Sequence, residues 1–117
     1  MQYDWIEQYL LPMKGVEVEY KAEWDAILYK IGGKIFAMVG NDKDGNDVIS
    51  MKLLPEYGIE LREKYDDIAP GYHLNKVHWN SMQLNGNVPD DVAKTMLTQS
   101  YNLVFAGLTK KQQQNIN

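Results

Sequence analysis

The sequence predicts an α+β fold of two layers, in which helices pack on one face of an antiparallel β-sheet. Two observations support this prediction. The spacing of the apolar residues changes along the chain in the order helix, strands, helix, strand, helix. The strand-like segments between residues 16 and 54 also follow one another with short polar or glycine-containing connections, which is typical of an antiparallel meander.

The length and composition indicate a single domain. The chain has 117 residues, of which 44% are hydrophobic and 24% are charged, and this is enough for one hydrophobic core. We expect residues 1–111 to form the domain and residues 112–117 to be a frayed tail. The chain has no cysteine and no apolar run near the ~20 residues of a membrane span, so we expect a cytoplasmic protein without a membrane segment.

A short helix and a first strand are predicted near the N-terminus. Trp5 precedes Tyr9 by four residues, which is helical spacing, and Pro12 ends the segment 3–11. Over residues 16–20, valine or tyrosine alternates with glutamate. This alternation predicts a strand with one buried and one exposed face.

A β-hairpin is predicted at a pair of glycines. The segments 27–31 and 34–40 flank Gly32 and Gly33, which supply the positive φ angles that a two-residue turn requires. The second of these segments is apolar on both faces, which indicates a central strand. After a polar loop, a further strand is predicted over residues 47–54 because apolar and polar residues alternate again.

Two longer helices are predicted in the second half of the chain. Their apolar residues recur at steps of three and four, after Pro55 in one case and from Val92 to Leu108 in the other. Pro89 and two aspartates mark the start of the second of these helices. Gly58 in the first costs about 1 kcal/mol relative to alanine. The first apolar stripe consists of Leu54, Tyr57, Leu61, Tyr65 and Ile68.

One more strand is predicted between these helices, over residues 76–84. Its apolar residues do not share one face of the strand. Val77 and Trp79 have odd numbers and would point to one face, whereas Met82 and Leu84 have even numbers and would point to the other. A β-bulge at residues 80–81 would turn all of them inward. Two short strands would fit the pattern as well.

The charge balance disfavours a protein that coats nucleic acid. The net charge is −4 and Arg62 is the only arginine among twelve basic residues. Lysine and arginine supply most non-specific affinity for phosphates, and arginine is the preferred reader of guanine. Any DNA contact would therefore have to come from a local patch.

Metal sites and catalytic motifs are not indicated. The loop 42–47 resembles a calcium loop, but placing Gly45 at the required glycine makes Met51 the closing ligand, where a carboxylate is needed. His73 and His78 lie five residues apart, without the further ligands that zinc needs. No nucleophile elbow is visible. We expect no metal, no cofactor and no enzymatic activity.

The most informative segment is residues 70–81, which contains both histidines, a lysine, two asparagines and two large aromatic residues. Tyr72 and Trp79 are expected to anchor this segment in the core, since large aromatic side chains bury much apolar surface. The polar residues between them have no such structural role. They are His73, Asn75, Lys76 and His78.

A set of short motifs also carries a family resemblance. The matching residues are Gly33-Lys34, Phe36-Ala37, Met51-Lys52-Leu53, Pro55-Glu56, Leu61-Arg62, Pro70-Gly71-Tyr72-His73-Leu74-Asn75-Lys76, His78-Trp79-Asn80, Leu84, Gly86, Pro89-Asp90, Ser100-Tyr101 and Leu103-Val104. With these motifs, the chain resembles the MmcQ/YjbR-like family of small bacterial proteins, which are often labelled DNA-binding. The resemblance implies an α+β sheet with helices on one side and a double-wing DNA-binding arrangement.

These observations lead to two functional hypotheses. The first is a non-enzymatic, weak DNA-binding or regulatory module, whose binding would fall steeply with salt. Its expected contacts are His73, Asn75, Lys76, His78 and Asn80, with Lys34 and Lys52 as neighbouring phosphate contacts and Tyr72 and Trp79 as braces. The alternative is a domain that binds a small molecule or a protein in a pocket around Trp79, Tyr101 and His73.

Overall fold

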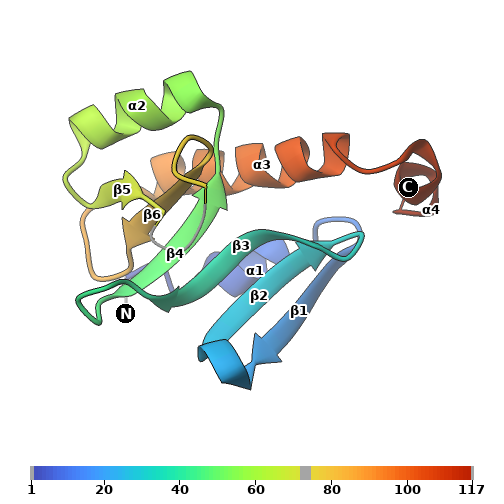
Figure 1. The fold of residues 1–117 in the computed structure, drawn as a ribbon, viewed down its shortest axis with the longest axis horizontal. Coiled ribbons are helices and arrows are strands. Elements are labelled where there is room, and N and C mark those ends of the chain that lie inside the picture. The colour runs from blue at the N-terminus through green and yellow to red at the C-terminus, as the bar shows by residue number, and fades with distance from the viewer. Residues whose placement is uncertain (1, 72–74, 117) are drawn as a thin grey trace.

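The computed structural model describes residues 2–71 and 75–116 and contains one antiparallel sheet with the strand order β1-β2-β3-β4-β6-β5 (Figure 1). The strands are β1 (Val16–Lys21), β2 (Ala26–Ile31), β3 (Lys34–Asn41), β4 (Asp47–Lys52), β5 (Ile68–Pro70) and β6 (Trp79–Gln83). The helices are α1 (Ile6–Leu10), the 3-10 turn η1 (Ala22–Trp24), α2 (Pro55–Lys64), α3 (Asp90–Ala106) and α4 (Lys110–Ile116).

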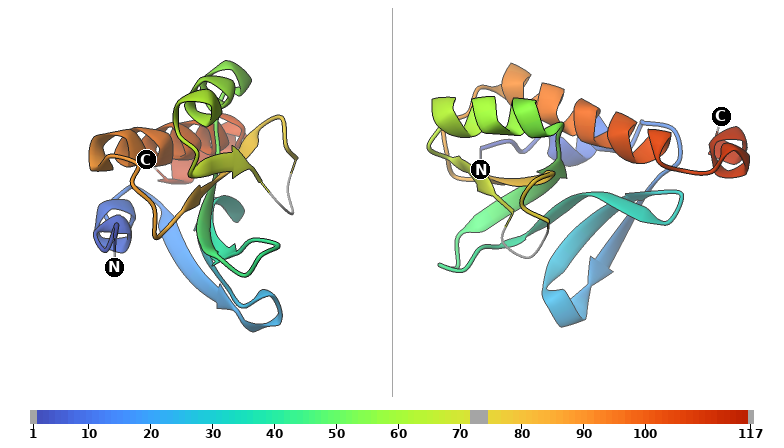
Figure 2. Two further views of the ribbon diagram at one scale, coloured as in Figure 1. Left: turned by 90° about the vertical axis from the view of Figure 1, so that its left-hand side faces the viewer. Right: turned by 45° about the horizontal axis from the view of Figure 1, so that its top comes forward.

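The helices and the sheet form two layers, as the sequence predicts. Helix α3 packs across β3 and β4, and α2 packs against β5. In the left view of Figure 2, α1 and α3 lie on one side of the sheet, and residues 75–78 before β6 extend on the other side. We call the side of the sheet that faces away from α3 the open face. Within the described residues, no helix is long and apolar enough to cross a membrane.

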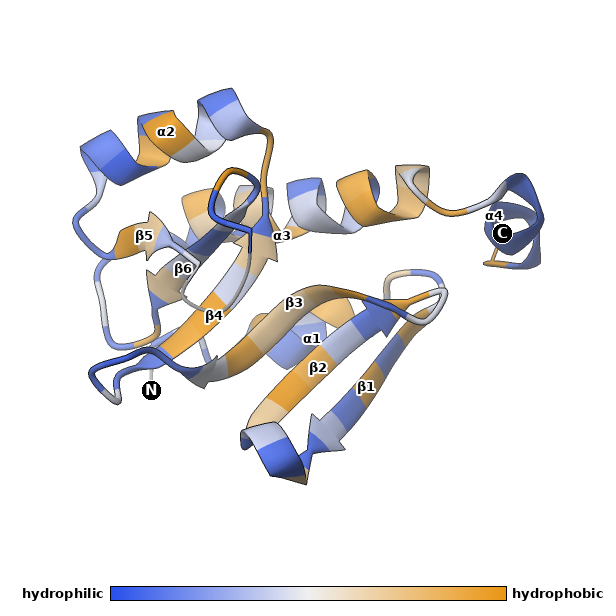
Figure 3. Cartoon of the chain, viewed as in Figure 1, coloured by the Kyte–Doolittle hydropathy of each residue, from blue (hydrophilic) through white to orange (hydrophobic). Residues whose placement is uncertain are grey.

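The core lies between α3 and the sheet. Ile49 and Met51 of β4, Met82 of β6 and Met96 and Leu97 of α3 are fully buried there. Figure 3 shows this apolar character along β2, β3 and β4, whereas α4 is mostly hydrophilic. The alternation read from the sequence therefore places apolar side chains where the helix layer covers the sheet.

The predicted glycine hairpin is confirmed, whereas the predicted β-bulge is wrong. Gly32 and Gly33 join β2 to β3 with φ angles of 58° and 80°. The ladder between β4 and β6 runs without interruption through residues 79–83. Val77 lies before β6 and is 58% exposed. Its side chain does not turn inward, so the reason for expecting a bulge does not apply. The sheet is irregular instead at Phe36 of β3, which has no partner on β2.

Two further predicted boundaries differ from the structure. The apolar stripe after Pro55 includes Ile68, but α2 ends at Lys64, and Ile68 pairs with Met82 as the first residue of β5. Burying Ile68 against the neighbouring strand needs an extended backbone. Residues 112–116 lie in α4 rather than in a frayed tail.

The contacts of α4 explain why residues 110–116 form a helix that packs on the domain. Gln112 Nε2 donates a hydrogen bond to the Gly32 carbonyl. A Cβ atom on Gly15 would approach the Ile116 side chain within 2.9 Å, so these two residues are closely packed. The apolar Ile116 thereby holds the last turn of a hydrophilic helix against the domain.

Candidate binding groove

Strand β3 presents apolar side chains on both faces of the sheet. Ala37 and Val39 belong to the core side, where they pack with α3 and its neighbours. Because Phe36 is an extra residue in the ladder, Ile35 and Met38 both reach the open face although they are three residues apart. The open face of β3 is therefore apolar.

A concavity of about 670 Å³ lies over this part of the open face. Ala26, Ile35, Met38 and Gly40 line it from β2 and β3. We call this concavity the β3 groove. Its volume falls within the ~300–1,000 Å³ of typical ligand pockets, and its lining is mostly apolar, as in such pockets.

Two tryptophans from distant parts of the sequence complete the β3 groove. Trp24 comes from η1 and is 56% exposed, and Trp79 is the first residue of β6 and is half-buried. The ammonium group of Lys21 lies 4.5 Å from the centre of the Trp24 ring. Trp79 is therefore not the core anchor that the sequence predicts, because it borders a concavity rather than the interior.

The polar end of the β3 groove is formed by Asn41 and Asp42. Asp42 Oδ1 accepts hydrogen bonds from the backbone N–H groups of Asp44 and Asn46, both at 2.9 Å, and Oδ2 accepts one from Gln83 Nε2 at 3.1 Å. The bonds from Asn46 and Gln83 lower the pKa of Asp42. The groove therefore carries a fixed negative charge at one end.

Three predicted contact residues lie on the ladder opposite Trp79 or in the turn before it. Lys52 of β4 is the ladder partner of Trp79, so the two side chains point to the same open face. Lys76 is exposed in the turn before β6, and His78 is half-buried there. The His78 carbonyl accepts a hydrogen bond of 2.7 Å from the Leu53 N–H, which fixes this turn against the end of β4.

Asn75 and Asn80 have structural partners in the chain. Asn75 Oδ1 accepts a hydrogen bond from the Val77 N–H at 2.9 Å and so shapes the turn before β6. Asn80 is fully buried, and its Oδ1 accepts a hydrogen bond from the Arg62 guanidinium. Because side chains alternate along a strand, Asn80 points to the core side while Trp79 points to the open face. The Asn80 amide is thus not available to a nucleic acid, contrary to the sequence-based hypothesis.

Tyr101 does not share a pocket with Trp79. It lies on α3, its ring meets Phe36 edge-on at 5.5 Å, and its hydroxyl donates a hydrogen bond of 2.6 Å to the Lys14 carbonyl. These contacts place Tyr101 on the helix side of the sheet. Lys34 is exposed at the start of β3. The predicted site residues Tyr72 and His73 lie outside the described residues.

Sequence reasoning missed Trp24, Ile35 and Met38 as site residues. The signal that could have identified them was the apolar pattern on both faces of residues 34–40. In a two-layer fold with helices on one face, such a strand leaves apolar side chains on the other face. Trp24 carried no comparable signal, since η1 is not a periodic element.

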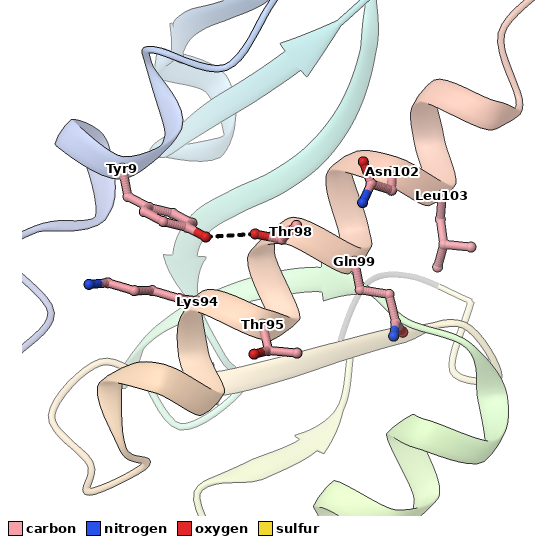
Figure 4. Close-up of a pocket in the computed structure, with 7 residues that line it drawn as sticks. All are labelled: Tyr9, Lys94, Thr95, Thr98, Gln99, Asn102 and Leu103. Carbon is pink, nitrogen blue, oxygen red and sulfur yellow. Dashed lines mark hydrogen bonds between the residues drawn. The ribbon is translucent and has the colours of Figure 1, made fainter.

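A second concavity, of about 470 Å³, lies on the outer side of α3 (Figure 4). Tyr9, Lys94, Thr98 and Gln99 line it. The Tyr9 hydroxyl and Thr98 Oγ1 are hydrogen-bonded to each other at 2.7 Å, and Gln99 Oε1 accepts the Leu54 N–H. These polar groups already join α1 and the start of α2 to α3, so this concavity is a poorer candidate than the β3 groove.

Known proteins with similar sequences cover most of this chain. It is 33% identical over 94 residues to the uncharacterized protein YjbR of Escherichia coli K12, which covers 80% of this chain and 79% of that protein. It is 35% identical over 89 residues to the uncharacterized protein YbdF of Escherichia coli O157:H7, covering 76% and 72%, respectively.

Solved structures and a family model give the same result. The Deinococcus radiodurans protein DR2400 matches with a TM-score of 0.85 and 30% identity, over 98% of this chain and 87% of that chain. A Pseudomonas syringae protein shares the fold, with a TM-score of 0.75 and 24% identity over 88% and 98% of the two chains. The family model described as YjbR matches residues 11–103. These matches confirm the resemblance inferred from the motifs, and the chain belongs to the YjbR family.

Proposed function

We propose that this protein is a binding protein that holds a small organic molecule with a flat, apolar body in the β3 groove. The observation that carries the proposal is the position of Trp24 and Trp79, which border one apolar concavity on the face of the sheet opposite α3. Tryptophan side chains offer large flat surfaces for aromatic ligands at low entropic cost. This proposal develops the small-molecule hypothesis, with different residues around Trp79.

The composition of the groove supports binding rather than catalysis. Among the described residues that line it, Asp42 is the only one that titrates, and its carboxylate is held by its own loop and Gln83. General acid–base or nucleophilic catalysis would need a second reactive group beside it. The negative charge of Asp42 favours a ligand that carries an N–H or a positive group at that end of the groove.

An NMR titration with a library of flat aromatic fragments tests this proposal. The fragments should include tryptamine, which is cationic, and indole-3-acetate, which is its anionic counterpart. We expect saturable changes in the backbone amide signals of Met38 and Gly40 and in the indole N–H signal of Trp79, with tryptamine bound more tightly than indole-3-acetate. If no fragment changes these signals, the proposal is wrong.

Substitution of Trp24 gives a matched control within this experiment. Trp24 is 56% exposed, so Trp24→Ala should leave the fold intact while weakening fragment binding by about tenfold. Tyr20 is 62% exposed and is not among the described residues of the groove. Tyr20→Ala should therefore bind fragments as the wild type does. Equal weakening in both variants would contradict a site in the β3 groove.

DNA binding is the second candidate function, and a specific arrangement favours it. Lys52 is the ladder partner of Trp79, and Lys76 and His78 lie in the turn that leads into β6 at Trp79. Proteins that bind single-stranded nucleic acid combine stacking on aromatic rings with lysine contacts to phosphates. The family resemblance also implies a double-wing DNA-binding arrangement. The net charge of −4 limits any such binding to low affinity and low salt.

Fluorescence anisotropy with labelled duplex and single-stranded DNA, at low and near-physiological salt, separates the two candidates. If DNA binds through this patch, Lys76→Ala/His78→Ala should abolish binding, and salt should weaken it steeply. Lys110→Ala/Lys111→Ala, which alters exposed lysines of α4, should retain binding. No binding at low salt would exclude the DNA candidate and leave the β3 groove proposal to the NMR experiment.

A further inference from the structure

The two edges of the sheet differ in how they are protected. At one edge, β5 has only three residues, ends at Pro70 and packs against α2. At the other edge, β1 has six residues and pairs only with β2. In Figure 1, no described strand lies beyond β1, and α4 lies near its N-terminal end only. An unpaired edge of this length presents free backbone N–H and C=O groups to another strand.

The side chains of β1 divide into an apolar face and a charged face. Val18 and Tyr20 share the helix side of the sheet, but α3 does not cover them, and they are 40% and 62% exposed. Glu17, Glu19 and Lys21 point to the open face. The strand predicted to have one buried face is therefore exposed on both, since it lies at the edge beyond the helix layer.

We propose that a second copy of this chain pairs with β1 in antiparallel orientation, with Glu19 opposite Glu19 of the second copy. This register places Glu17 opposite Lys21 of the second copy, and the two-fold axis repeats this pair. It also places Val18 opposite Tyr20 of the second copy on the other face. The two sheets then join into one continuous sheet, in which the Glu17–Lys21 and Val18–Tyr20 pairs are complementary.

Charge selects this register over the one centred on Val18, and the length of β1 selects it over the one centred on Tyr20, which would pair only residues 19–21 before the strand ends at Lys21. In a two-fold antiparallel pair, side chains that lie opposite each other point to the same face of the joined sheet. One residue of β1 then lies opposite its own copy, and the neighbouring registers are centred on the residue before or after it. Pairing centred on Val18 would place Glu17 opposite Glu19 of the second copy twice, which is repulsive. In the proposed register only Glu19 meets its own copy, and each Glu19 is bonded to Lys30 at 2.5 Å.

A charge-swap experiment by sedimentation velocity tests the dimer and its register. From about 10 µM to about 1 mM, the wild type should show a concentration-dependent dimer, because a contact of one strand is small and weak. Glu17→Lys alone places two lysines opposite each other, and Lys21→Glu alone places two glutamates opposite each other. Each variant should dimerise about tenfold more weakly than the wild type.

Mixing the two variants provides the decisive result. In the proposed register, residues 17 and 21 of each variant meet an opposite charge on the other variant, while Glu19 faces Glu19 as in the wild type, so the mixture should form a heterodimer at least as tight as the wild-type dimer. In the register centred on Val18, the mixture would retain one repulsive pair of glutamates. A mixture that stays as weak as its components therefore overturns the register.

Controls exclude effects of net charge and of misfolding. Glu63→Lys and Lys64→Glu on α2 make the same charge changes at exposed positions away from β1 and should leave dimerisation unchanged. Lys21→Glu removes the contact with the Trp24 ring, so its fold is checked by circular dichroism. Val18→Lys, at a 40% exposed position, should also abolish the dimer. A wild type that stays monomeric up to about 1 mM overturns the proposal.

Discussion

Ser100 of α3 donates a hydrogen bond of 2.5 Å to the backbone carbonyl of Phe36, the extra residue of β3. The same Oγ accepts the N–H of Lys52 at 2.8 Å. In the register of β3 and β4, Phe36 and Lys52 would be the next ladder pair after Ala37 and Met51. The Ser100 hydroxyl thus takes the place of a direct bond between the strands and anchors α3 at the point where the ladder ends.

Replacing Ser100 should therefore destabilise the fold. Ser100→Ala leaves a carbonyl and an N–H without partners in a fully buried place, and we expect the free energy of unfolding to fall by about 2–4 kcal/mol. Urea denaturation followed by circular dichroism measures this loss. Thr95→Ala, at an exposed position of the same helix, should change it by less than about 0.5 kcal/mol. Similar losses in both variants would contradict the structural role of Ser100.

Gly58 of α2 should resist substitution although it lies inside a helix. A Cβ atom there would lie 2.9 Å from Asn80 Nδ2 and 3.1 Å from Arg62 Nη1, and Nη1 donates a part-buried hydrogen bond to Asn80 Oδ1. In an exposed helix, glycine to alanine gains about 1 kcal/mol. For Gly58→Ala we expect a loss of about 1–3 kcal/mol in the free energy of unfolding, since Asn80 has no room to move.

Gly107 after α3 is the matched control for Gly58. Its φ of −83° is one that any residue adopts, and a Cβ atom there would make contacts of 3.5 Å and longer. Gly107→Ala should therefore raise the free energy of unfolding by about 0.5–1 kcal/mol, because alanine reduces the conformational entropy of the unfolded chain. Thermal unfolding compares the two variants, and a stabilised Gly58→Ala would show that the Asn80–Arg62 pair adapts to the added methyl group.

The sequence predicts the elements of this fold better than it predicts the groove. Hydrophobic spacing and the Gly32-Gly33 turn are local signals, so the order of helices and strands follows from them. The extra residue at Phe36 depends on a hydroxyl 64 positions away, and no local pattern indicates it. Asn80 was expected at the surface because polar residues usually lie there, but its partner Arg62 is on another element.

Asp42 should make the β3–β4 turn sensitive to acid. Because the native pKa of Asp42 lies below its usual 3.8, the carboxylate stabilises the folded turn above the unfolded pKa, and this stabilisation is lost as the pH falls through the native pKa. An NMR titration of the Asp42 carboxyl carbon should give a midpoint below 3.8. Gln83→Ala removes the bond to Oδ2 and should move the midpoint upward. A midpoint unchanged by Gln83→Ala would contradict this bond.

Asn75 should control the turn that positions Trp79. Its side-chain oxygen accepts the Val77 N–H, and its backbone carbonyl accepts the Trp79 N–H at 2.8 Å. Asn75→Ala removes only the first bond, so hydrogen exchange at Val77 should become about fivefold faster, as expected for one exposed hydrogen bond. Asn75→Asp keeps an acceptor oxygen at the same position and should exchange as the wild type does.

The same pair of Asn75 variants connects the turn to the β3 groove. If the turn holds Trp79 at the border of the groove, fragments that bind there should bind Asn75→Ala more weakly and Asn75→Asp with wild-type affinity. The free energy of unfolding should stay within about 0.5 kcal/mol in both variants, because Asn75 is exposed. Faster exchange at Val77 without any loss of fragment affinity would separate the turn from the groove and leave Trp79 positioned by β6 alone.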